Sequence, residues 1–214
     1  MKKIVLILLL SFIFTGKGNA QAGTEFWFGF MENAGTVNNL HMVVFIATDR
    51  PVSGTISVPL SGYSQSFNIV ADSVLEIELP VATVMHVGSE IIENKGVHLV
   101  TSDSVLLYVL NTKMSTGDGT SVLPSSLLDT SYTILSYNAS GTGYPGLSQF
   151  LIVATENNTT VIFEPTDTTI NGVLPFAQDT IMLNAGQSYQ VQNRDGDLTG
   201  SRVKSDFPLA VLEV

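Results

Sequence analysis

The sequence contains no cysteine among its 214 residues. This absence excludes a disulfide scaffold, a thiolate metal site, a cysteine nucleophile and the lipid anchor of a bacterial lipoprotein. Charged residues are scarce at 13%, whereas hydrophobic residues reach 44%, and this balance excludes intrinsic disorder. Lys and Arg number 9 against 19 Asp and Glu, for a net charge of −10. Because an acidic surface repels phosphate backbones, we expect no nucleic-acid partner.

Long apolar runs are also lacking, except for one at the N-terminus. Two lysines precede an apolar run at residues 4–14, and small residues follow. A run of about eleven residues is too short to span a bilayer, which needs about twenty, and this succession is typical of a signal peptide. We therefore expect residues 1–22 to be a signal peptide, cleaved after Ala20 or Ala22. The alternative is an uncleaved anchor or a buried N-terminal helix.

Removal of this segment takes away three lysines and no acid, so the net charge of the mature chain becomes −13. No later stretch is long and apolar enough to cross a bilayer, so we expect no transmembrane segment after signal cleavage. Export without cysteine is typical of bacterial envelope or secreted proteins. The sequence thus predicts a secreted or surface-displayed protein.

The mature chain consists of short β-branched and aromatic runs separated by Gly, Pro, Asn, Asp and Ser. Apolar and acidic residues alternate over residues 75–79, which is the pattern of a half-buried antiparallel strand. Residues 105–110 are apolar throughout, which predicts a central strand covered on both faces. Helical periodicity is nearly absent, and only residues 125–129 favour a single helical turn. We therefore expect an all-β sandwich or barrel.

The two halves of the mature chain resemble each other. Residues 41–49 match residues 149–156 in order and character, and each segment is followed by a polar turn and a strand ending in proline. The opening strand at 26–31 has a weaker counterpart at 132–137. We therefore expect an all-β fold of two tandem antiparallel β-sandwich-like units related by internal duplication.

The expected boundaries follow from this repeat. A signal peptide at 1–22 precedes a first β unit at 23–111, a connector at 112–130 rich in Ser, Thr, Gly and Asp, and a second β unit at 131–214. Because Val214 lies inside an apolar strand with no polar tail, we expect the chain to be a fragment whose second unit is truncated.

Several segments along the mature chain carry a family resemblance. They are residues 23–26 with 32–33, 95–97, 108–111, Asp118 with 122–124, 150–154 with 158–161, and 197–201 with 205–211. In order and spacing they resemble the IgGFc-binding protein N-terminal domain family over nearly the whole mature chain. The resemblance implies an extracellular, non-enzymatic binding module. In bacteria, similar domains occur in large Bacteroidota surface proteins with adhesive repeats and gliding-motility-associated or type IX secretion sorting domains.

The residues that could support catalysis are scattered. His41, His86 and His98 show no His-Glu-x-x-His spacing, so we expect three surface histidines rather than a metal or catalytic site. No Gly-x-Ser-x-Gly motif occurs, and Glu76 and Glu78 share the solvent face of one strand. We therefore expect a protein that is not an enzyme.

Three aspartates are candidate calcium ligands. Asp195 and Asp197 flank a glycine, and Asp118 lies between two glycines. Loop carboxylates can offer oxygen ligands to calcium, although Asp-Gly is also the composition of a tight turn. No other cofactor is expected.

The aromatic residues suggest where a ligand would bind. Trp27 lies in a strand with aromatics on both faces, which favours a strand covered on both sides over a sugar platform. Tyr63, Tyr144 and Tyr189 lie near expected turns and are the candidate contacts. We expect a binding or adhesion module for an extracellular protein or glycan, with loops held on a rigid β scaffold. The alternatives are a structural spacer domain of a large surface protein and, third, a glycan-active enzyme.

Overall fold

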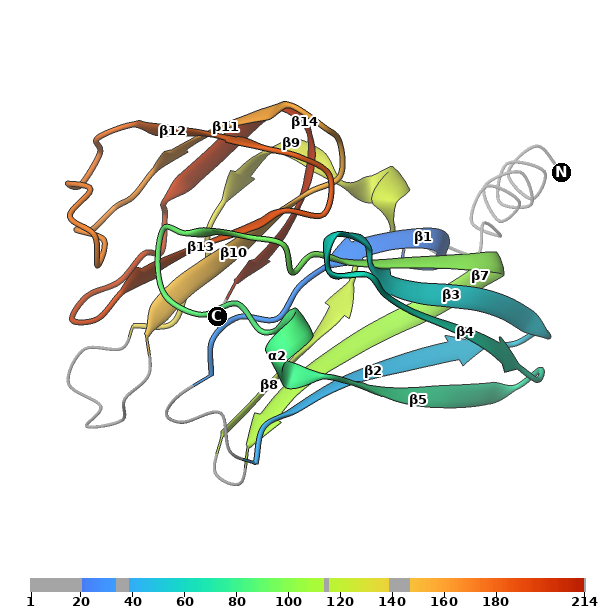
Figure 1. Cartoon of the computed structure of the whole chain (residues 1–214). Coiled ribbons are helices and arrows are strands. Elements are labelled where there is room, and N and C mark those ends of the chain that lie inside the picture. The colour runs from blue at the N-terminus through green and yellow to red at the C-terminus, as the bar shows by residue number, and fades with distance from the viewer. Residues whose placement is uncertain (1–20, 34–38, 114–115, 139–146, 214) are drawn as a thin grey trace, which may run out of the picture.

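The computed structural model describes residues 21–33, 39–113, 116–138 and 147–213. Nearly all of the expected signal peptide, and the candidate contact Tyr144, lie outside these residues. Helical structure in the described part is limited to three short elements, α2 (Val81–Val84), η1 (Pro59–Ser61) and η2 (Ser125–Leu127). None of them has the length and hydrophobicity that crossing a bilayer demands. The expected all-β fold is confirmed (Figure 1).

The first sheet has seven strands in the order β4-β3-β7-β2-β5, with β1 and β8 also paired to β7. Its strands are β1 (Gly23–Phe28), β2 (His41–Thr48), β3 (Val52–Val58), β4 (Tyr63–Ile69), β5 (Ser73–Leu79), β7 (Val97–Lys113) and β8 (Thr116–Val122). All pairs are antiparallel. Because β7 is 17 residues long, its first half can pair with β1 and β3 while its second half pairs with β2 and β8.

The second sheet has seven strands in the order β12-β11-β14-β10-β13-β6, with β9 also paired to β14. Its strands are β6 (Ile92–Glu93), β9 (Asp129–Thr133), β10 (Ser148–Ala154), β11 (Thr159–Glu164), β12 (Asp179–Leu183), β13 (Ser188–Asn193) and β14 (Arg202–Glu213). The long strand β14 takes the central place that β7 has in the first sheet.

The two sheets repeat one strand order once β6 and β8 are set aside. Strands β1 to β5 and β7 correspond to β9 to β13 and β14, with the same partners in each sheet. The predicted pair of similar antiparallel units is therefore confirmed. The first sheet curls into a half-barrel and the second into a nearly closed barrel (Figure 1).

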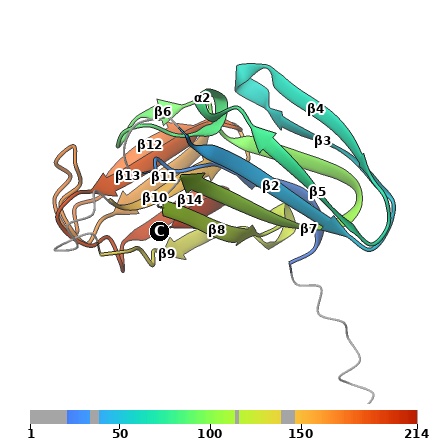
Figure 2. The same ribbon diagram turned by 90° about the horizontal axis from the view of Figure 1, so that it is seen from below.

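Two short segments do not follow the expected boundaries of the units. Strand β6 comes from the chain between β5 and β7 but pairs with β13 of the second sheet. The expected connector at 112–130 contains β8, which pairs with β7 of the first sheet, and η2. Figures 1 and 2 show the two curled sheets side by side. The turn between β3 and β4 reaches the second unit, because a Cβ on Gly186 would lie 3.6 Å from Leu60 Cγ.

Each unit has its own apolar core on the inner face of its curled sheet. The largest fully buried side chains include Phe26, Phe28 and Leu99 in the first unit and Phe150 and Phe163 in the second. Burying a side chain of this kind contributes about 1.5–3 kcal/mol. The buried side chains of each core thus stabilise the curl of its sheet.

The expected coverage of residues 105–110 on both faces is wrong. The strand is central in its hydrogen bonding, but Leu106 and Tyr108 are exposed while Val105, Leu107 and Val109 are buried. The cause is that a single curled layer has only one inner face, so the outer positions of β7 meet solvent.

A third apolar cluster joins the two units. Trp27 and Met31 pack with Leu151, Val153 and Ala210. Trp27 is only 7% exposed, whereas its neighbours Phe26 and Phe28 belong to the core of the first unit. The expectation that the strand carrying Trp27 is covered on both sides is confirmed, and the second unit provides the outer cover.

Candidate functional site

Two loops of the second unit lie against each other and form the candidate site. They are residues 165–178, between β11 and β12, and residues 194–201, between β13 and β14; we call them together the loop surface. Asp197 N donates to Asp167 Oδ2 at 3.4 Å across the two loops. Next to them, Asn193 Nδ2 donates to Thr168 O at 2.6 Å. The end of β13 therefore holds the first loop against the second.

A cavity of about 370 Å³ opens between the two loops. Asp167, Arg194, Asp195 and Ile170 are among its lining residues. Gly196 lies at the point of closest approach, because a Cβ there would lie 1.8 Å from Asp167 Oδ2. The cavity offers carboxylates and one guanidinium, which suits hydrogen bonding and ion pairing to polar groups of a partner.

The longer loop also presents apolar side chains to solvent. Leu174 is exposed, and Phe176 is 69% exposed with a φ of 61°. The turn is fixed by Phe176 N, which donates to Pro165 O at 2.7 Å, and by Ala177 N, which donates to Leu174 O at 3.0 Å. A left-handed backbone costs a non-glycine residue about 1–2 kcal/mol, and such strain gathers at functional positions. Exposed aromatic anchors are typical of protein-binding surfaces.

A segment of the first unit supports the longer loop. Residues 85–96, which we call the arm, reach across to the second unit. Thr169 Oγ1 donates to Glu90 Oε1 at 2.6 Å, and Asn171 N donates to Glu90 Oε2 at 2.9 Å. Asn171 Nδ2 also donates to Ser89 O at 2.9 Å. The Glu90 carboxylate thus fixes, through these hydrogen bonds, the first part of the loop that carries Phe176.

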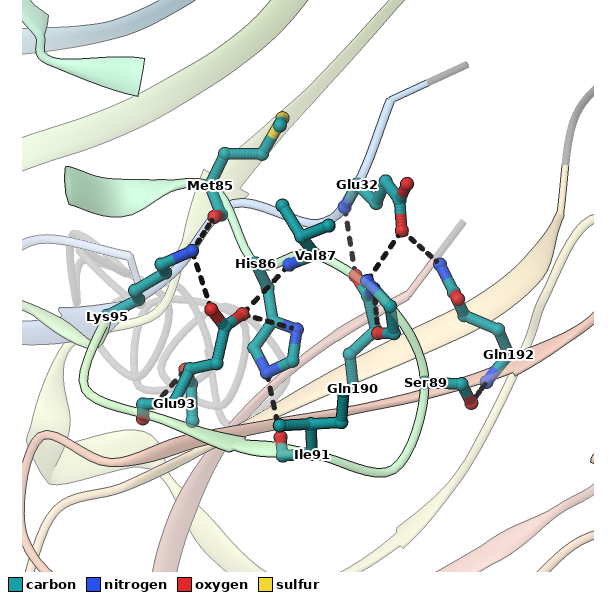
Figure 3. Close-up of polar contacts among 12 residues, drawn as sticks. Glu32, Met85, His86, Val87, Ser89, Ile91, Glu93, Lys95, Gln190 and Gln192 are labelled. Carbon is teal, nitrogen blue, oxygen red and sulfur yellow. Dashed lines mark hydrogen bonds and ion pairs between the residues drawn. The ribbon is translucent and has the colours of Figure 1, made fainter. Parts of the chain in front are cut away.

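The arm is itself fixed to β13 by hydrogen bonds (Figure 3). Glu90 N donates to Gln190 O at 2.6 Å, and Gln192 N donates to Ser89 Oγ at 2.9 Å. The Glu32 carboxylate accepts from Gly88 N at 2.7 Å and from Gln192 Nε2 at 3.3 Å. Both units therefore contribute donors and acceptors to this junction, which positions the arm that contacts the longer loop.

His86 lies inside the same junction and is fully buried. Its Nδ1 is 3.0 Å from Glu93 Oε2, and its Nε2 is 3.1 Å from Ile91 O (Figure 3). Lys95 Nζ lies 2.7 Å from Glu93 Oε1. Burial lowers the pKa of His86, and the nearby Glu93 carboxylate partly opposes this shift.

The expectation of three surface histidines is therefore wrong for His86. The chain between β5 and β7 folds into the junction between the units instead of lying in solvent as an ordinary loop. His98 is partly covered as well, since its ring stacks on Trp27 with centroids 4.0 Å apart. His41 is half-exposed and pairs with Glu78.

The candidate calcium ligands are divided between two regions. Asp195 and Asp197 lie in the loop surface, whereas Asp118 lies on β8 of the first sheet, opposite Asn111. Partial burial raises the pKa of the Asp118 carboxyl. Asp197 Oδ1 accepts from Thr199 N at 2.8 Å, as in a tight turn. In the parts of the chain that the structure describes, no group of three His, Asp or Glu side chains is arranged to hold a metal ion.

The tyrosines predicted to contact a ligand differ in exposure. Tyr63 is partly exposed, and its hydroxyl donates to Gln65 Oε1 at 2.8 Å. Tyr189 is buried in the core of the second unit, so its expected role as a contact is wrong. Leu174 and Phe176 were not predicted; the available signal was a set of apolar residues in a long segment without a strand pattern.

These features define an all-β domain that presents anchored loops on a rigid scaffold. Residues 118–213 match the model of the family described as IgGFc binding protein. The matched residues include the whole loop surface, and the resemblance seen in the sequence is confirmed over them. No curated protein and no solved structure matches the chain significantly.

Proposed function

We propose that this chain is an extracellular, non-enzymatic binding module whose partner is a protein. The observation that carries the proposal is the match of residues 118–213 to a family named for binding the Fc part of IgG. The exposed Leu174 and Phe176 lie inside the matched region. These two side chains provide an apolar surface to which a protein partner would bind.

The loop surface combines the features of a protein-binding site. Phe176 and Leu174 provide exposed apolar side chains on the longer loop, and Asp167, Asp195 and Arg194 provide polar groups in the cavity between the two loops. The loop is held before binding through Glu90, so less conformational entropy is lost when a partner docks. The net charge of −13 on the mature chain favours encounter with a partner whose surface is cationic.

Export is part of this proposal. The two lysines, the apolar run at 4–14 and the small residues before Ala22 support a signal peptide at 1–22. A reporter fused to residues 1–22 should leave the cytosol of a bacterial host, and replacement of two apolar residues of the run by Arg should retain it inside. Equal export of both reporters would contradict this part of the proposal.

The binding proposal is tested by immobilising mature residues 23–214 and measuring retention of IgG, isolated Fc and mucin. We expect one of these probes to be retained, and Phe176→Asn to weaken its binding by about tenfold or more. Asparagine tolerates the left-handed backbone, so this variant removes the aromatic ring and keeps the turn. The matched control is Val70→Ser, at an exposed apolar residue of the first unit.

Two outcomes would contradict the proposal. One is failure of the folded chain to retain any of the three probes, which would favour a structural spacer. The other is equal binding by wild type and Phe176→Asn.

A further inference from the structure

The contact between the two units uses different surfaces of each unit. The first unit contributes the outer side of its opening strand, with Trp27, Gly29 and Met31. The second unit contributes the outer face of β10 and β14, where Leu151 and Val153 lie opposite Leu212 and Ala210. The two units are similar, but the contact uses the opening strand of the first unit and the sheet face of the second. The equivalent opening strand of the second unit and the equivalent sheet face of the first unit therefore have no such contact.

Strand pairing identifies the unpaired surface of the second unit. Trp27 pairs with His98 on β7, and Thr133 pairs with Arg202 in the equivalent place on β14. Thr133 is therefore the equivalent of Trp27. By the same spacing, Leu135 and Tyr137 are the equivalents of Gly29 and Met31. We call these three residues the free strand face. Leu135 is 70% exposed and Tyr137 is 56% exposed. Ile134 between them is buried, as Phe28 is in the first unit.

Strand pairing also identifies the unpaired surface of the first unit. Val43 lies opposite Leu110, and Phe45 lies opposite Tyr108, in the places that Leu151 with Leu212 and Val153 with Ala210 have in the second unit. Tyr108 is 43% exposed, and the neighbouring Leu106 is exposed as well. Val43 itself is only 7% exposed, so we call Phe45, Leu106, Tyr108 and Leu110 the free sheet face.

We propose that the free strand face of one copy of this chain docks on the free sheet face of a second copy, head to tail. The argument is continuity with an existing interface, because the same pair of surfaces is already joined once inside the chain. The side chains of the proposed contact are also compatible in size. Inside the chain, the large Trp27 and the small Ala210 belong to one cluster. Between two copies, the equivalent residues are the small Thr133 and the large Tyr108.

Charge supports the same pairing of surfaces. Glu76 and Glu78 lie opposite Phe45 and Val43 at the edge of the free sheet face. Arg202 and Lys204 lie on β14 opposite Thr133 and Ser131, beside the free strand face, and both are exposed. Two anions would therefore approach two cations when the copies dock. Packing two free sheet faces together would instead bring like charges together, so a symmetric dimer is disfavoured.

The association is weaker than the contact inside the chain, for two reasons. The arm adds many hydrogen bonds to the internal contact, whereas the corresponding connection of the second unit, residues 194–201, is short. Gly29 also allows close approach, since a Cβ there would lie 2.7 Å from Leu151 Cδ2, whereas Leu135 carries a full side chain. We expect a dissociation constant of about 10–100 µM and reversible association.

The first experiment is sedimentation velocity of mature residues 23–214 from about 5 to 500 µM, which spans the expected dissociation constant. The weight-average sedimentation coefficient should rise with concentration and pass beyond the value of a dimer, because a head-to-tail contact does not close. A single monomeric species over the whole range would overturn the proposal.

The second experiment separates the two surfaces by mutation. Leu135→Asp with Tyr137→Asp blocks the free strand face, and Leu106→Asp with Tyr108→Asp blocks the free sheet face. Each double variant alone should associate at least about tenfold more weakly than wild type. An equimolar mixture of the two should form a dimer and nothing larger, because one good surface of each kind remains.

The remaining controls keep the result decisive. Leu174→Asp places the same charge on an exposed residue of the loop surface and should leave self-association unchanged, so failure of the proposed partner binding and failure of this proposal are distinguishable. Circular dichroism checks the fold of each variant, and the single changes Leu135→Asp and Tyr108→Asp replace any double variant that does not fold. A mixture that remains monomeric would overturn the head-to-tail arrangement.

Discussion

His86 has an acceptor beside each ring nitrogen, Ile91 O and the Glu93 carboxylate, in a place with no access to solvent. A neutral imidazole can donate only one hydrogen bond, and Nε2 donates it to Ile91 O. Nδ1 then lies 3.0 Å from Glu93 Oε2 without hydrogen-bond geometry. Sequence patterns could not predict this environment, because a histidine in a connection between strands is ordinarily solvated.

The lowered pKa of His86 predicts how stability depends on pH. The unfolded chain binds the proton more readily than the folded chain, so the free energy of unfolding should fall as pH drops below about 6.5, by at most about 1.4 kcal/mol per unit. Urea denaturation between pH 5 and 8 measures this slope. His86→Gln should reduce this slope. Equal slopes in wild type and His86→Gln would contradict the assignment.

The calcium ligands Asp195 and Asp197 stay a prediction at the same scale. If their loop binds calcium, added calcium should raise the melting temperature by more than about one degree, because the ion binds only the folded chain. Asp195→Asn with Asp197→Asn should abolish the increase, and Asp118→Asn serves as the comparison. A calcium-induced increase in melting temperature of less than about one degree in the wild type would contradict calcium binding.

Among the secondary-structure elements, strands with a regular alternation were predictable and those without it were not. The segment 75–79 alternates clearly and forms β5, with Ile77 and Leu79 buried. β8 is rich in Thr, Gly and Ser, and of its residues only Val122 is buried; it is a strand because it pairs with β7 along its length. Tertiary pairing of this kind overrides local propensity.

The arm and the loop surface depend on each other in a testable way. Glu90 has a φ of 58°, and its carboxylate accepts from both Thr169 and Asn171. Glu90→Asn keeps a residue that tolerates this backbone but is too short to hold both donors. Hydrogen exchange in residues 165–178 should then become at least about tenfold faster. Glu156→Asn, at an exposed turn, is the control, and unchanged exchange in Glu90→Asn would refute the anchoring role.

For the whole molecule, the repeat could be predicted from the sequence, but the arrangement of its two units could not. The match between residues 41–49 and 149–156 follows from similar patterns of core residues, and β2 and β10 occupy equivalent places. The contact between the units depends instead on the outer side of one strand, where Trp27 and Gly29 fit the face of Leu151 and Val153. Periodicity alone shows that such a face is apolar and does not show what covers it.

The loop surface could be predicted only in part, and the reason is physical. Asp195 and Asp197 were singled out because two carboxylates flank a glycine in a loop. Phe176 instead lies in a loop whose shape is set by contacts with Pro165 and the arm. No local pattern encodes contacts between segments that are far apart in the chain.

The central claim is that the loop surface of this module binds a protein partner. Hydrogen exchange of mature residues 23–214, measured with and without the retained probe among IgG, Fc and mucin, tests it most directly. The account predicts slower exchange in residues 165–178 and 194–201 when the probe is bound. Protection confined to the first sheet, with both loops unchanged, would contradict it.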